Sequence, residues 1–118
     1  MSHATDIVIG LVAVLQFYFL VLEMFLWDKP FGLRTFRLTP EFARASKPLA
    51  ANQGLYNGFL CAGLIWGLWL GPAGQDVKLF FLLCVLAAGL YGGLSVHRKI
   101  LLVQALPAIV ALLMLLVI

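Results

Sequence analysis

The residue best placed to do chemistry is Glu23, in the stretch "VLEMFLWDKP", because its carboxyl group stands inside an apolar run. The run extends from Ile7 to Trp27 and is otherwise interrupted only by Gln16. On insertion scales an ionised side chain costs about 2.5–3.5 kcal/mol at the centre of a membrane helix and less near its end, so such residues persist where they are paired or functional. Glu23 is therefore the first candidate for a site.

Polar side chains stand at the corresponding ends of three further apolar runs. Glu23 lies roughly 6 Å inside the end of its run, and Asn52 and Gln104 lie at similar depths in theirs. We predict that these ends form one ligand-binding cluster, in which Glu23 is the acceptor or base. Asn57, with Asn52, would clamp a ligand through its amide, and Arg98 would anchor an anion. The predicted site residues are Glu23, Asn52, Tyr56, Asn57, Tyr91, His97, Arg98 and Gln104.

Three interpretations of this cluster stay open. It is a cytoplasm-facing pocket for a lipid head group or a small polar molecule such as a thiol. Alternatively, Glu23 bonds Asn52, Asn57 or Arg98 and only holds helices together, as in a structural or accessory membrane protein. A small transporter is disfavoured, because the other ends of the runs carry almost no comparable polar groups.

Motifs for other chemistries are missing. No catalytic residue is assigned, because the chain contains no Ser-His-Asp set, no HExxH and no glycine-rich phosphate loop. No metal site is predicted, since His97 lacks an acidic or cysteine partner at ligand spacing and His3 would lie on the opposite side of the membrane. Cys61 and Cys84 lie deep in apolar runs and are interpreted as packing thiols. No cofactor is predicted, and whether the protein is an enzyme stays open.

The elements that position the cluster are predicted to be membrane-spanning helices. The 118 residues are 64% hydrophobic and 11% charged, too few polar residues to coat a water-soluble domain. A spanning helix needs about 20 mostly apolar residues. The sequence therefore predicts an all-α integral membrane protein, a single domain over residues 1–118. Its four spans are residues 7–27, 49–70, 77–94 and 100–118.

The basic residues predict the orientation of these spans. Five lie in the connection over residues 28–48 and two more, Arg98 and Lys99, in the third connection, whereas Lys78 alone lies on the other side. The positive-inside rule then places both connections in the cytoplasm and both termini on the non-cytoplasmic side of the membrane. Contact with anionic lipid explains the net charge of +3, and nucleic-acid binding is not expected.

The first connection carries a helix-start pattern, with Thr39 as N-cap and Pro40 at the first helical position. We predict a short interfacial helix from Pro40 to about Ser46, and an irregular, interface-hugging loop over "KPFGLRTFRL". In the last span, Pro107 removes the hydrogen bond to the Val103 carbonyl and should kink the helix.

Two family resemblances follow from particular motifs. The segments "LVLEMFLWDKPFG", "FARASKPLAANQGLYNGFL" and "VQALPAIVALLML" resemble the bacterial membrane family known as domain of unknown function 1304, over nearly the whole chain. That resemblance implies a small four-span protein of the bacterial inner membrane, without an assigned activity.

More remotely, "LGP" at residues 70–72, the basic turn before the last span and "QALP" at residues 104–107 resemble the membrane-associated eicosanoid and glutathione metabolism (MAPEG) proteins. This second resemblance implies a four-helix bundle that assembles as a homotrimer and binds glutathione. Asn52 matches an asparagine of the MAPEG pattern, but Leu55 replaces its glutamate. Leu49, Ala50 and Ala51 replace its basic residues, so most of the glutathione pattern is missing.

Overall fold

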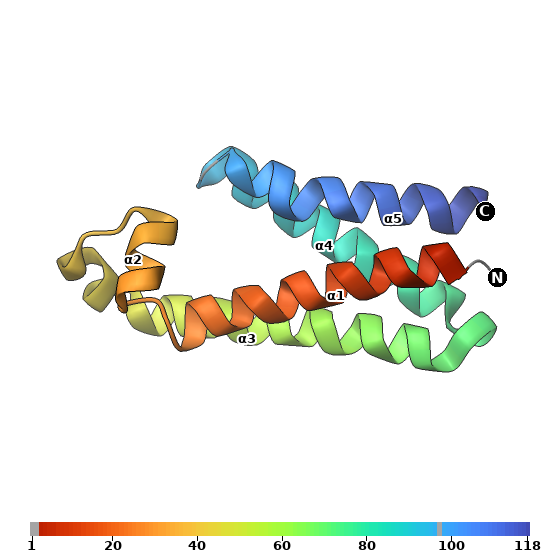
Figure 1. Cartoon of the computed structure of the whole chain (residues 1–118), viewed down its shortest axis with the longest axis horizontal. Coiled ribbons are helices and arrows are strands. Elements are labelled where there is room, and N and C mark those ends of the chain that lie inside the picture. Colours follow the sequence, from red (N-terminus) through yellow and green to blue (C-terminus); the bar gives the residue numbers. More distant parts are fainter. Residues whose placement is uncertain (1–2, 97) are drawn as a thin grey trace. The chain divides into compact units, whose positions relative to one another are not determined.

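The computed structural model describes residues 3–96 and 98–118, and within these ranges the chain is helical, with no strand (Figure 1). An all-helical fold is therefore confirmed. The elements in chain order are α1 (His3–Met24), α2 (Pro30–Phe36), α3 (Pro40–Leu70), the 3-10 turn η1 (Gly71–Gly74), α4 (Gln75–Ser95), the π-helical turn η2 (Leu101–Ala105) and α5 (Leu106–Val117).

Two helical stretches of the described chain are long and apolar enough to cross a membrane, judged by length and composition. One is α1, and the other runs without a break from Pro40 to Ser95 through α3, η1 and α4. The last apolar stretch, Leu101–Val117, is helical but shorter. Four separate spans remain a prediction.

The chain divides into two compact units, which are described separately. The first contains residues 1–15 and 60–118, and the second contains residues 16–59. Helices α1 and α3 contribute to both units. The apolar core of the first unit is formed by buried aliphatic side chains of α1, α3, α4 and α5, including Ile9, Leu64, Leu82, Val85 and Ala108.

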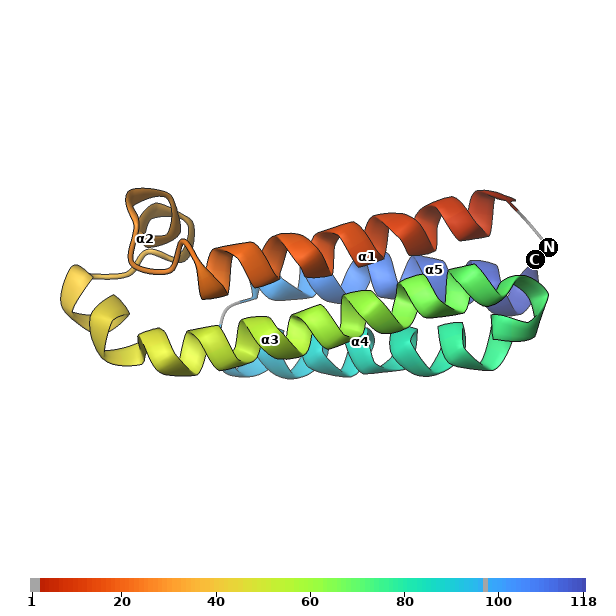
Figure 2. The same ribbon diagram turned by 90° about the horizontal axis from the view of Figure 1, so that it is seen from below.

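Glycines bring the helices of the first unit into close contact. A Cβ on Gly67 of α3 would lie 3.1 Å from the backbone nitrogen of Lys78 in α4. A Cβ on Gly89 of α4 would lie 2.7 Å from the backbone nitrogen of Ala105 in η2. Helix α4 also packs along α5, as Figures 1 and 2 both show. Small residues at such contacts allow the backbones to approach, which is how helices associate where lipid provides no hydrophobic drive.

The helix is irregular near Pro107, where the sequence predicts a kink, and the irregularity is a π-helical turn. Residues 101–105 form a π-helical turn directly before it, and the Leu106 amide donates to the Leu101 carbonyl, five residues back. Because proline cannot donate to the carbonyl four residues earlier, the wider turn re-forms the hydrogen bonding around it. The disruption at Pro107 is therefore absorbed by one wide turn, from which α5 continues to Val117.

The first connection is more helical than the sequence predicted. Helix α3 begins at Pro40 as expected, and the Phe42 amide donates to the Thr39 side-chain oxygen at 3.2 Å. The prediction of a separate helix ending near Ser46 is wrong, because α3 continues through Pro48 to Leu70. One proline removes one backbone donor, and the alanine-rich turns around it favour a continuous helix.

The segment expected to be an irregular loop contains α2. Pro30 occupies one of its first two helical positions, where a missing N–H is not needed. Gly32 is buried, and a Cβ there would overlap the backbone carbonyl of Leu26. Only glycine therefore permits this short helix to lie against the residues that follow α1.

Candidate functional site

The candidate site lies in the second unit and centres on the Glu23 carboxylate, near the C-terminal end of α1. The Asn57 side-chain nitrogen donates to its Oε1 at 2.5 Å, and the Gln53 side-chain nitrogen donates to its Oε2 at 2.7 Å. Both donors belong to α3 and are four residues apart, so they project from the same face of that helix. Glu23 is only 6% exposed, and each of its oxygens accepts one bond from α3.

Close packing of α1 on α3 makes these bonds geometrically feasible. A Cβ on Gly54 would lie 3.1 Å from the Glu23 Cβ and 3.2 Å from the Leu20 carbonyl oxygen. A Cβ on Gly58, one turn later, would lie 2.7 Å from a methyl carbon of Leu20. Larger residues at these two positions would push the helices apart, and short amide side chains could then no longer reach the carboxylate.

The electrostatic surroundings of Glu23 are unusual for a buried acid. Among the described residues no Lys, Arg or His side chain forms an ion pair with it; its hydrogen-bond donors are neutral amides. A carboxylate offers about four lone-pair positions, and α3 uses two of them. The site can therefore still accept hydrogen bonds, and it lacks a compensating positive charge.

A second set of contacts joins the residues after α1 to the first turns of α3. The Trp27 indole nitrogen donates to the Ser46 hydroxyl at 3.0 Å, and Lys47 pairs with Asp28 at 3.0 Å. The hydrogen bond from Lys47 lowers the pKa of the Asp28 carboxyl below its ordinary value. The Trp27 ring also packs on Phe36 of α2, with ring centroids 4.9 Å apart. These contacts fix the start of α3 beside the end of α1.

The predicted site residues fall in both compact units of the chain. Asn57 is buried and bonds Glu23, so one of the three predicted partners of the carboxylate is among its actual partners. Asn52 and Tyr56 are exposed, and neither bonds Glu23. Three other predicted site residues belong to the first unit: Tyr91 and Arg98, which are exposed, and Gln104, which is buried. His97 lies outside the described residues. A single cluster of all eight residues stays a prediction.

Gln53 was not among the predicted site residues, although it bonds the carboxylate. The signal that could have identified it is its four-residue separation from Asn57, which places both amides over one helix face. The sequence predicts Asn52 instead, because its depth in its helix matches that of Glu23. One residue corresponds to a rotation of about 100° around the helix, and this rotation turns Asn52 away from the contact.

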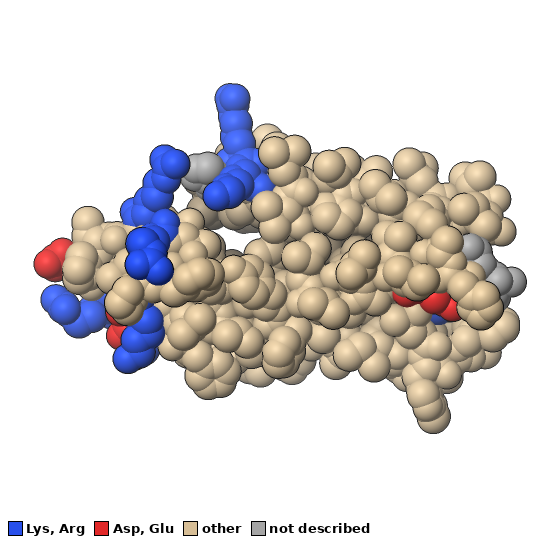
Figure 3. All heavy atoms as spheres, viewed as in Figure 1, with Lys and Arg blue, Asp and Glu red and all other residues tan. Residues whose placement is uncertain are grey.

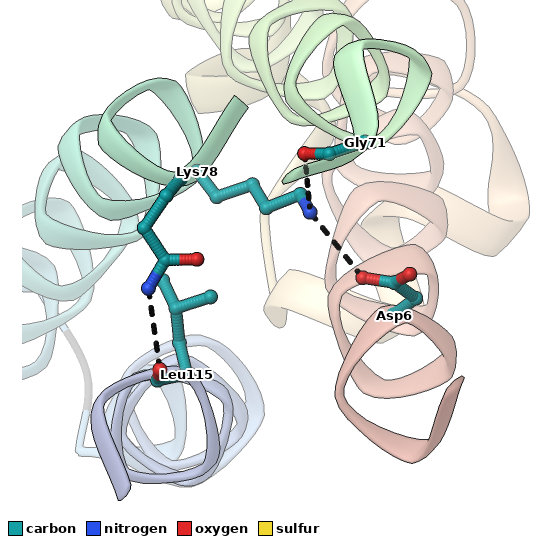
Figure 4. Close-up of polar contacts among 5 residues, drawn as sticks. Asp6, Gly71, Lys78 and Leu115 are labelled. Atoms are coloured by element: carbon teal, nitrogen blue, oxygen red, sulfur yellow. Dashed lines mark hydrogen bonds and ion pairs between the residues drawn. The ribbon is translucent and has the colours of Figure 1, made fainter. Parts of the chain in front are cut away.

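The first unit contains a second buried charge, Lys78, at the start of α4. Its side chain is fully buried, and its ammonium group lies 3.4 Å from Asp6 of α1 and 3.3 Å from the Gly71 carbonyl oxygen (Figure 4). One turn earlier, the Gln75 amide donates to the Leu115 carbonyl oxygen at 3.3 Å and satisfies a group left open at the end of α5. The sequence uses this lysine only to predict the orientation of the spans, whereas the structure shows that it forms an ion pair with Asp6.

Comparisons with known proteins give a family without an assigned activity. A family model described as "Protein of unknown function (DUF1304)" matches residues 10–116. The uncharacterized protein YpaA of Lactococcus lactis subsp. lactis (strain IL1403) is 35% identical over 114 residues, which cover 95% of this chain and 96% of that protein. No solved structure matches. The MAPEG resemblance, with the homotrimer and glutathione that it implied, gains no support from these matches.

Proposed function

We propose that this protein is a multi-pass protein of the bacterial inner membrane and that it binds a small polar or lipid-like ligand at Glu23. The chain belongs to the DUF1304 family of proteins of unknown function. The observation that carries this proposal is a buried carboxylate whose hydrogen-bond donors are neutral amides, one of them on the exposed residue Gln53.

The chemistry of the carboxylate suggests the class of ligand. A buried negative charge is stable when it is paired and fully hydrogen-bonded, and two neutral amides supply hydrogen bonds without a compensating charge. A ligand with an ammonium group or another donor-rich cation would supply both the missing positive charge and further hydrogen bonds. Gln53 lies on the exposed side of the network, so a ligand can replace its bond to Oε2 while Asn57 keeps Oε1 in place.

The membrane placement rests on composition and charge. Two described helical stretches have the length and hydropathy of spanning segments, and five of the eight basic residues lie between α1 and residue 48. We propose the four spans and the orientation that the sequence predicts, with this basic connection in the cytoplasm. Glu23 then lies near the cytoplasmic surface, where a ligand from the cytoplasm or the inner leaflet reaches it.

Native mass spectrometry of the full chain in a mild detergent tests the ligand. The wild-type protein should carry a non-covalent adduct, and Glu23→Gln should lose it while melting within a few degrees of wild type. Glu41→Gln is the matched control, because it makes the same change at an exposed carboxyl of the same unit. A wild-type protein without any adduct, or an adduct that Glu23→Gln retains, would overturn the proposal.

A second candidate is a structural protein in which this network only joins α1 to α3. It is favoured by the fact that both Glu23 oxygens already accept a bond from α3. This candidate predicts that Glu23→Gln lowers the melting temperature strongly and that no variant carries an adduct. The same three proteins therefore separate the two functions.

A further inference from the structure

We propose that residues 28–47, the basic segment, bind the phosphate groups of anionic phospholipids, and that Arg37 is kept in an unfavourable backbone conformation for this purpose. The inference goes beyond ligand binding at Glu23, because it concerns other residues and another partner. It rests on the Arg37 backbone, on the charges of the segment and on its exposed aromatic residues.

Arg37 ends α2 in the left-handed region, with φ 54° and ψ 49°. It is the one non-glycine residue with positive φ in the described chain. Its amide and that of Leu38 both donate to the Leu33 carbonyl, an ending in which glycine is the usual residue. A side chain in this region crowds the backbone, so an arginine here costs stability that a glycine would not. Such an outlier suggests that the side chain itself is needed.

Most of the positive charge of the basic segment has no internal partner. Lys47 pairs with Asp28, whereas no carboxylate of the described residues pairs with the remaining four cations. Those four are exposed, and they are Lys29, Arg34, Arg37 and Arg44. Figure 3 shows Lys and Arg side chains gathered over α2 and the start of α3. With five basic and two acidic residues, the segment carries a net charge of +3.

Exposed aromatic rings point to a lipid surface as the source of the phosphate. Phe31, in the first turn of α2, is 43% exposed, and Phe42, in the first turn of α3, is 57% exposed. Cationic and aromatic side chains together are typical of segments that lie at the level of lipid head groups, where the rings enter the acyl boundary. Guanidinium groups also bind phosphate oxygens in a two-pronged geometry.

The experiment titrates the full-length protein in detergent with phosphatidylglycerol or phosphatidylcholine and follows the melting temperature. Wild type should be stabilised selectively by phosphatidylglycerol. Arg37→Gly should lower the apparent affinity for phosphatidylglycerol about fivefold, the contribution of one cation near an anionic surface. Without lipid it should melt at or above the wild-type temperature, since glycine suits the left-handed position.

Two controls complete the design. Arg37→Lys keeps the charge in the same backbone position and should retain most of the selectivity for phosphatidylglycerol. Glu23→Gln should titrate like wild type, so failure of the ligand proposal leaves this one intact. Unchanged phosphatidylglycerol affinity in Arg37→Gly would overturn the inference. So would a lower melting temperature of that variant without lipid, because the arginine would then be retained for packing.

Discussion

Gly54 lies at a close contact of α3 with α1, and a single added methyl group tests that contact. In Gly54→Ala the new Cβ would lie 2.6 Å from the Met24 Cγ, 3.1 Å from the Glu23 Cβ and 3.2 Å from the Leu20 carbonyl oxygen. The methionine can rotate, but the Leu20 backbone cannot yield without moving α1. The added methyl therefore has to be accommodated by separation of the two helices.

The expected magnitude combines two opposing effects. Overpacking costs about 1–3 kcal/mol, and replacing glycine by alanine within a helix gains about 0.5–1 kcal/mol. Gly54→Ala should therefore destabilise the protein by up to about 2.5 kcal/mol. Gly10→Ala is the matched control, because the same methyl on α1 meets nothing within 4 Å. It should stabilise by about 0.5–1 kcal/mol.

Thermal unfolding can be followed with a thiol-reactive dye, because Cys61 is 8% exposed in the folded protein and becomes reactive on unfolding. Gly54→Ala should melt below wild type and Gly10→Ala at or above it, in the same detergent. If Gly54→Ala melted as high as Gly10→Ala, the close approach of α1 to α3, and the hydrogen-bond geometry at Glu23 that depends on it, would be refuted.

Two further predictions concern ion pairs, and a third concerns the orientation of the chain in the membrane. Asp6→Asn should destabilise by about 1–3 kcal/mol, because it leaves buried Lys78 without its counter-charge, while solvent around the 36% exposed Asp6 side chain weakens the pair. Lys78→Met should cost less, and equal melting temperatures would contradict this order. The contact with Lys47 lowers the pKa of Asp28 in the folded protein below the ordinary value of 3.8. The contact therefore stabilises the folded protein fully at pH values above 3.8, and this stabilisation is lost as the pH falls through the lower folded pKa. The melting difference between wild type and Asp28→Asn should therefore disappear under acidic conditions and persist at neutral pH. A fluorescent protein that matures only in the cytoplasm should be dark when fused after Ile118, and a bright fusion would mean that the orientation is reversed.

The sequence predicts the helical character of the chain well because its signals are local. Thr39 and Pro40 indicate the start of α3, and the structure confirms it. The continuation of that helix through Pro48 was missed, because a proline indicates a lost hydrogen bond and does not by itself indicate whether the helix ends. Helix α2 was missed because its stability depends on Gly32 lying against Leu26, a contact that no local pattern reveals.

The candidate site was predictable only in part, because local sequence signals identify single residues but not all of their partners in space. Glu23 stood out because an acid within an apolar run is costly, and Asn57 was among its predicted partners. Whether Gln53 or Asn52 bonds Glu23 depends on which side of α3 faces α1. The depth of a residue along the helix does not determine that side. The ion pair of Lys78 is not predictable from local patterns, because its partner Asp6 lies 72 residues away in the sequence.

The central claim is that a ligand binds the Glu23 carboxylate from its exposed side and replaces the hydrogen bond from Gln53. The most direct test measures the side-chain amide NMR signals of Gln53 and Asn57 in the protein as purified and after bound small molecules and lipids are removed. We predict that the Gln53 signal changes between the two preparations, while the signals of Asn57 and of Gln75, which bonds the Leu115 carbonyl, stay the same. A Gln53 signal that is identical in both preparations would contradict the claim and leave the network as a contact between helices.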